Sequence, residues 1–101
     1  MDWIKCFKEY TRVYRVHALR RMFERNITFD EINEIKDRVE VIEEYPGDVP
    51  NPSCLILGFT RANRPIHVVY SINHEEKTVI IITIYVPDKN KWENDFRRRV
   101  T

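Results

Sequence analysis

The sequence predicts an α+β domain in which two N-terminal helices pack on one face of a four-stranded, mainly antiparallel sheet. Three observations lead to this fold class. Apolar residues recur every three or four positions up to about residue 38, and the pattern then changes to a period of two. A helix-start signature precedes the second helix, and short turns divide residues 39–86 into four segments. The chain has 101 residues, of which 43% are hydrophobic and 33% charged, so we expect one soluble domain over 1–101.

The main helices are predicted over residues 16–25 and 28–38. At about 100° per residue, the first helix has an apolar side and an opposite polar side. The apolar side consists of Ala18, Leu19, Met22 and Phe23, and the polar side of His17, Arg20, Arg21, Glu24 and Arg25. Thr28 and Glu31 form a capping-box pair at the start of the second helix, and Ile27 and Ile32 have the spacing of a hydrophobic staple.

Two stretches near the N-terminus carry weaker signals. Asp2 can cap a short helix with an apolar edge of Trp3, Ile4 and Phe7. Residues 11–16 are rich in β-branched and aromatic side chains, which fits either a short strand or an extended lead-in to the helix at residue 16.

The four strands are predicted over residues 39–45, 53–60, 65–72 and 78–86. Three prolines make residues 46–52 a rigid loop, and Asn63 is the residue best suited to a positive φ in the turn at 61–64. Residues 91–96 are predicted to form a last helical turn. We expect a buried core that includes Leu19, Met22, Phe23, Ile32, Ile35, Leu55, Leu57, Val69, Ile82 and Ile84.

Charge is unevenly distributed although the formal net charge is only +1. Arginines gather in residues 12–25 and at 97–99, whereas acidic residues concentrate in 31–44. The candidate RNA-binding residues are Arg20, Arg25, Arg97 and Arg98. Because a basic terminus is often only a solvated tail, this distribution is a weak indication of nucleic-acid binding.

Cys6 and Cys54 are far apart and have no CxxC partner, so we expect reduced thiols in a cytoplasmic protein. No apolar run approaches the length of about 20 residues needed to cross a bilayer, and no targeting signal is evident. The three histidines lack metal-ligand spacing, and neither glycine lies in a phosphate-binding loop. We therefore expect no metal and no cofactor.

The remaining candidates for chemistry form a metal-free set. His17 and Arg21 are neighbours on one helix face, Arg64 and His67 lie at the start of the third strand, and Tyr85 lies near the end of the fourth. If the helix crosses the sheet near these strand ends, all five converge on one concave surface. Such a set suits RNA cleavage by the adjacent 2′-hydroxyl, which needs a base, an acid and cations around the phosphate.

Each of these residues also has a structural interpretation. His67 alternates with Ile66 and Val68 and fits a core histidine with one hydrogen bond. Arg64 lies in a turn, where arginine is common, and Tyr85 on an apolar strand fits a core position. The pattern alone leaves both interpretations open.

Several segments resemble, in order and spacing, a family of small prokaryotic domains of unknown function (family 4258). They are residues 16–28 (VHALRRMFERNIT), 41–46 (VIEEYP), 52–55 (PSCL), 64–69 (RPIHVV) and 82–89 (ITIYVPDK), and the match extends over about 13–99. Members of this family resemble RelE-like toxins in predicted fold and are often encoded beside a small zinc-finger protein of the antitoxin type.

The resemblance implies a toxin-like endoribonuclease that acts on mRNA, with or without the ribosome, and is neutralised by a zinc-finger partner. The resemblance assigns this sequence to a class of protein, but it identifies no catalytic residues. Two alternatives remain open: a non-catalytic module that binds a protein through its sheet edge or its acidic second helix, and a regulator that binds nucleic acid without cleaving it.

Overall fold

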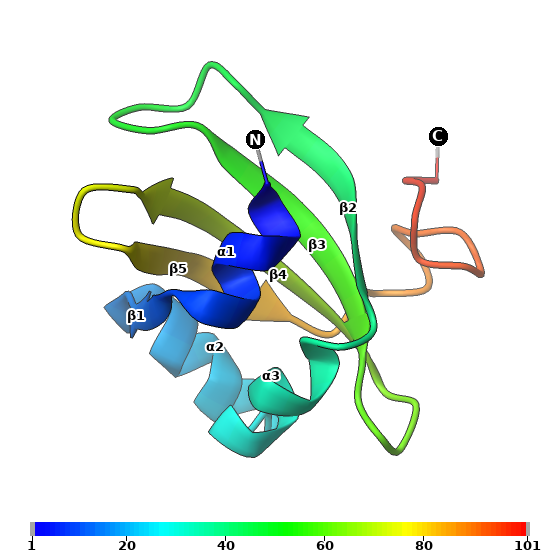
Figure 1. Cartoon of the computed structure of the whole chain (residues 1–101). Helices are drawn as coiled ribbons and strands as arrows, with labels where there is room; N and C mark the ends of the chain where they lie inside the picture. The colour runs from blue at the N-terminus through cyan, green and yellow to red at the C-terminus, as the bar shows by residue number, and fades with distance from the viewer. Residues whose placement is uncertain (1, 101) are drawn as a thin grey trace.

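A five-stranded mixed sheet and three helices make up the computed structural model, which describes residues 2–100. Figure 1 shows the helices grouped on one side of the curved sheet. The elements in chain order are α1 (Trp3–Glu9), β1 (Thr11–Tyr14), α2 (Val16–Arg25), α3 (Phe29–Ile35), β2 (Val39–Tyr45), β3 (Ser53–Phe59), β4 (Pro65–Asn73) and β5 (Thr78–Tyr85).

The predicted four-stranded sheet is wrong in one respect, because β1 is a fifth strand. The strand order is β1-β5-β4-β3-β2, and β1 pairs parallel to β5 from Thr11↔Thr78 to Tyr14↔Ile81. The other three pairings are antiparallel. With four residues, β1 is too short for its alternation to distinguish a strand from an extended lead-in. The fold class itself, α+β with the helices on one face, is confirmed.

The local signals at the helix starts are confirmed. The Thr28 hydroxyl accepts from the Glu31 backbone N–H at 3.1 Å, and the Glu31 carboxylate accepts from the Thr28 N–H at 3.0 Å. Asp2 caps α1 by accepting from Lys5 N at 3.1 Å. The second main helix ends at Ile35, earlier than residue 38, and α1 is a complete third helix.

Burial corrects the predicted orientation of α2. Its buried residues are Ala18 and Met22, whereas Leu19 and Phe23 are exposed. The helix is rotated about its axis relative to the expectation, because small Ala18 lets its backbone approach β5. Of the other predicted core residues, Val69 and Ile82 are only half-buried. The remainder of the predicted core is buried as expected: Met22, Ile32, Ile35, Leu55, Leu57 and Ile84.

The sheet face opposite the helices is partly covered by the C-terminal segment, residues 86–100. The predicted helical turn at 91–96 is absent there: Trp92 instead forms an isolated antiparallel bridge with Arg99. Arg97 pairs with Glu40, and Arg99 pairs with Glu43 at 2.9 Å. Both acids belong to β2, so the segment is attached to the far edge strand.

Gly58 permits close packing between β3 and α3. A Cβ at this position would lie 2.7 Å from Cβ of Ile35, which is itself fully buried. We predict that Gly58→Ala lowers the free energy of unfolding by about 1–3 kcal/mol, the usual cost of overpacking a core. Gly47→Ala is the matched control, since no atom lies within 4 Å of its Cβ position. Denaturant unfolding of both variants checks this, and equal stabilities would contradict it.

Candidate functional site

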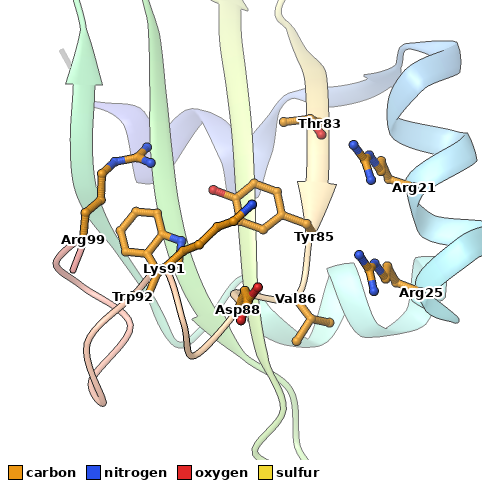
Figure 2. Close-up of a pocket in the computed structure, with 9 residues that line it drawn as sticks. All are labelled: Arg21, Arg25, Thr83, Tyr85, Val86, Asp88, Lys91, Trp92 and Arg99. Carbon is orange, nitrogen blue, oxygen red and sulfur yellow. The ribbon is translucent and has the colours of Figure 1, made fainter. Parts of the chain in front are cut away.

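A pocket of about 350 Å³ lies on the open face of the sheet, between α2 on one side and the C-terminal segment on the other. In Figure 2, Arg21 and Arg25 extend from α2 toward Tyr85, while Lys91, Trp92 and Arg99 close the opposite side. We call it the cationic pocket. Its lining residues are Arg21, Arg25, Thr83, Tyr85, Val86, Asp88, Lys91, Trp92 and Arg99.

The alternation of β5 places Tyr85 in this pocket. Ile84 is fully buried in the core below the helices, so the next side chain points to the opposite face. Tyr85 pairs in register with His67 on β4, and their rings meet edge to face with centroids 5.2 Å apart. The Tyr85 hydroxyl lies 3.3 Å from His67 Nδ1.

His67 is fully buried behind Tyr85, which corrects its predicted place on an accessible surface. Its Nε2 lies 2.9 Å from the carbonyl oxygen of Phe96. A carbonyl only accepts, so Nε2 donates there, and Nδ1 of the neutral ring accepts from the Tyr85 hydroxyl. Burial lowers the pKa of His67 from 6.5 to about 4. The neutral ring is thus fixed in one tautomer by the C-terminal segment.

Arg64 is not in the pocket, although the sequence placed it beside the phosphate. Its guanidinium donates to the carbonyl of Asn26 at 2.9 Å, to the carbonyl of Arg25, and to Glu31 at 3.2 Å. These carbonyls lie at the C-terminal end of α2, where unpaired backbone oxygens and the helix dipole attract a cation. Arg64 therefore ties α2 to α3 and β4.

The other predicted residues are divided between pocket and surface. Arg21 and Arg25 line the pocket with Tyr85, whereas His17, one turn before Arg21, is exposed and outside the lining. Arg20 and Arg98 are also exposed and outside it. Arg97 is held by Glu40. The structure thus brings together Arg21, Arg25 and Tyr85, with His67 directly behind them.

The pocket carries a net positive charge. Within residues 2–100, no carboxylate lies within ion-pair distance of Arg21, Arg25 or Lys91. Asp88 is the acid in the lining, and one of its oxygens accepts from the Asn90 backbone at 2.8 Å. Three cations without acidic partners therefore line the same pocket as Tyr85.

Arg99 differs from these three cations because it has a structural partner. Its guanidinium donates to both oxygens of Glu43 at 2.9 and 3.0 Å and stacks over the Trp92 ring at 4.6 Å. Hydrogen bonding from Arg99 is the main cause that lowers the pKa of Glu43. Arg99 positions Trp92, whose ring in turn packs edge-on against His67 at 4.4 Å.

The sequence reasoning missed Lys91, Trp92 and Arg99 as pocket residues. They follow the last strand in a segment without periodicity, so no pattern predicts that it folds back over the sheet. The three successive arginines at 97–99 were the available signal, and they indicated only a basic terminus. For metal binding, the part of the chain that is described contains no group of three or more His, Cys, Asp or Glu side chains placed to hold an ion.

The fold and the pocket define a class: a small α+β domain with a cationic pocket on the open face of a mixed sheet. The chain belongs to the family described as "domain of unknown function (DUF4258)", whose model matches residues 14–86. This confirms the family resemblance of the sequence. The matched range includes Arg21, Arg25 and Tyr85 but ends before Lys91 and Arg99. A comparison with curated proteins found no match to the chain. No helix within residues 2–100 has the length and apolar character of a membrane span.

We predict that the stability of the protein depends on pH through His67. Its folded pKa of about 4 lies below the ordinary value of 6.5, so the unfolded chain binds more protons between these values. Stability should therefore fall as the pH is lowered from about 6.5 to 4. Unfolding curves across this range measure the slope, and His67→Gln should reduce it. An unchanged slope in His67→Gln would assign the pH dependence to other groups.

Arg64→Ala should destabilise the fold, because the carbonyls of Arg25 and Asn26 lose a charged donor. We expect a loss of about 1–3 kcal/mol in the free energy of unfolding. Arg61→Ala is the matched control, since Glu34 contacts only the backbone N–H of this exposed arginine. Thermal unfolding distinguishes them. If both variants melt like the parent, the hydrogen bonds between Arg64 and the end of α2 contribute nothing to the stability of the protein.

Proposed function

We propose that this protein is a metal-independent endoribonuclease that binds one RNA phosphodiester in the cationic pocket. The observation that carries the proposal is that Arg21, Arg25 and Lys91, none of them with an acidic partner, line one pocket with Tyr85. Arginine binds phosphate in bidentate fashion, and cations around a pentavalent phosphorus stabilise the charge that develops there.

In the proposed reaction, the RNA 2′-oxygen attacks the adjacent phosphorus as the bond from phosphorus to the 5′-oxygen breaks. The 2′-hydroxyl proton passes to the Tyr85 oxygen while the Tyr85 proton passes to Nδ1 of His67, the contact that measures 3.3 Å. The 5′-oxygen takes a proton from solvent. His67 then returns its proton to the Tyr85 oxygen, which releases the former 2′-hydroxyl proton to solvent, so both residues regain their starting states. The products are a 2′,3′-cyclic phosphate and a free 5′-hydroxyl.

His67 acts in this scheme as a positioning residue, because it is buried and reaches the substrate only through Tyr85. Its Nε2 contact with the Phe96 carbonyl keeps Nδ1 free of hydrogen and able to accept. The role differs from the direct contact with phosphate that the sequence pattern suggested. His17 has no part in it.

The wider biological context is also a proposal and is supported by the family resemblance. We infer a RelE-like fold, since the helices cover one sheet face and the pocket lies on the other. By the same resemblance we propose mRNA as the substrate, a zinc-finger protein as the neutralising partner, and the cytoplasm as the location. Buried, unpaired Cys6 and Cys54 are compatible with a reducing compartment.

RNA cleavage by purified protein in the presence of a chelator tests the proposal, with and without ribosomes. We expect fragments that end in a 2′,3′-cyclic phosphate. Arg21→Ala should lower the rate roughly 10²–10³-fold, the scale for losing one group that stabilises transition-state charge. Tyr85→Phe should lower it by about 10²–10⁴, the scale of general acid–base catalysis.

Two matched controls lie on the same helix as Arg21. Arg20→Ala removes an arginine that is exposed and outside the pocket, so the rate should change little. His17→Ala distinguishes two predictions. The sequence pattern predicts a large loss of cleavage rate, whereas the pocket geometry predicts no loss, because His17 lies outside the lining. If no RNA is cut under any condition, or if Arg20→Ala is as damaging as Arg21→Ala, the proposed site is wrong.

A second candidate function, a non-catalytic interaction module, is favoured by the edge strand β1. Its outer edge has no strand beside it within the described chain, so its free backbone groups can accept a partner strand. The acidic helix α3 is less suited to binding a partner, because Glu31 already binds Arg64 and Glu34 already binds the Arg61 backbone. Co-purification followed by hydrogen exchange tests this alternative, with slower exchange along Thr11–Tyr14 as the expected result.

A further inference from the structure

The cationic pocket is larger than one phosphate group needs. Its volume of about 350 Å³ lies in the range of pockets that enclose whole small molecules. Two of its cations, Arg21 and Arg25, extend into it from α2. In Figure 2, the guanidinium group of Arg21 lies at the level of Thr83, whereas that of Arg25 lies further along β5, at the level of Val86. The two arginines therefore occupy successive positions along this strand.

The spacing of these arginines resembles the spacing of phosphates in a nucleic-acid backbone. Four residues of α-helix rise by about 6 Å, so Arg21 and Arg25 lie one turn apart on one side of α2. Successive phosphates of one strand are separated by a sugar and lie a similar distance apart. Each guanidinium group can bind one phosphate through two parallel N–H···O bonds. One side of the helix thus presents two phosphate-binding groups in sequence.

Arg25 is available for binding and its backbone is anchored. Within residues 2–100, no carboxylate lies within ion-pair distance of its guanidinium group, and this includes Asp88 of the same lining. The backbone carbonyls of Arg25 and Asn26 both accept hydrogen bonds from Arg64. The Arg25 side chain therefore extends from a fixed backbone position, which reduces the entropy lost when it binds a ligand.

The groups that act on the cleaved phosphate lie nearer to one of the two arginines. In Figure 2, the Tyr85 hydroxyl and the Lys91 amino group lie at the level of Arg21, and Arg25 lies further along the strand. A phosphate beside Tyr85 is therefore bound by Arg21 and Lys91. The next phosphate along the strand then has Arg25 as its partner.

We propose that the pocket binds two successive phosphates of one RNA strand: Arg21 and Lys91 bind the phosphodiester that is cleaved, and Arg25 binds the phosphate of the neighbouring nucleotide. This inference rests on the proposed function. It makes Arg25 a specificity-determining residue, which selects a strand that carries a flanking phosphate over an isolated dinucleotide.

Calorimetric titration with short RNA probes tests this inference. The probes are a dinucleoside monophosphate whose first sugar lacks the 2′-hydroxyl, so that it is not cleaved, and the same molecule with an added 3′- or 5′-terminal phosphate. We expect one of the two added phosphates to strengthen binding roughly tenfold to a hundredfold, the scale of hydrogen bonds to a charged group. The end at which this gain occurs gives the direction of the strand in the pocket.

Three variants assign the gain to a residue. Arg25→Ala should abolish it, whereas Arg21→Ala should weaken the binding of the probes with and without the added phosphate. Lys89→Ala is the matched control, because Lys89 is an exposed cation outside the pocket lining and its loss should leave the gain unchanged. Arg25 is exposed, so its replacement should preserve the fold, which circular dichroism verifies.

Several results would overturn the inference. If Arg25→Ala weakens the binding of all probes by the same factor, both arginines bind one phosphate. Equal binding of all probes by the wild-type protein, or no binding of any, would exclude a second phosphate site. A gain that is lost in Lys89→Ala would show a general effect of charge. Cleavage of a longer RNA tests the proposed function separately: a protein with an Arg25-dependent gain that cuts no RNA has the two-phosphate site without the nuclease activity.

Discussion

The hydrogen bond between His67 and the Phe96 carbonyl joins the two parts from which the pocket is made. Without the C-terminal segment, β4 and β5 would expose a buried imidazole, and the pocket would lack Lys91 and Trp92. With the segment in place, the ring is desolvated, held neutral and fixed in the tautomer that accepts from Tyr85. This contact fixes the hydrogen bonding available to Tyr85, and together with the Arg97–Glu40 and Arg99–Glu43 ion pairs it holds the segment that closes the pocket.

The side chains of helix α2 have three different environments. Ala18 and Met22 pack on the sheet, Arg21 and Arg25 line the pocket, and Val16, Leu19 and Phe23 are exposed. The orientation of this ten-residue helix determines which environment each side chain has. Arg64 holds the C-terminal end of α2, so an arginine outside the pocket lining anchors the helix that carries Arg21 and Arg25.

Much of the fold could be predicted because its signals are local. The capping box at Thr28 and the change of period at residue 39 specify their elements within a few residues of sequence. The rotation of α2 could not be predicted, since Leu19 and Phe23 are as apolar as Ala18 and Met22, and the choice between them depends on the surface of β5. The sequence correctly grouped Arg21 with Tyr85 but misplaced Arg64 and His67. For both, the deciding partners are backbone carbonyls, at Asn26 and Phe96, which any residue type could supply.

The parallel pairing of β1 with β5 affects the order in which the protein folds. Thr11 finds its sheet partner at Thr78, and Arg21 shares the pocket with Arg99, so neither the sheet nor the pocket can be completed on a growing chain. Contacts between residues so far apart in the sequence form slowly, so β1 has no strand partner until β5 has folded. The positively charged pocket therefore assembles only with the completed sheet, and a partly folded chain keeps its pocket cations apart.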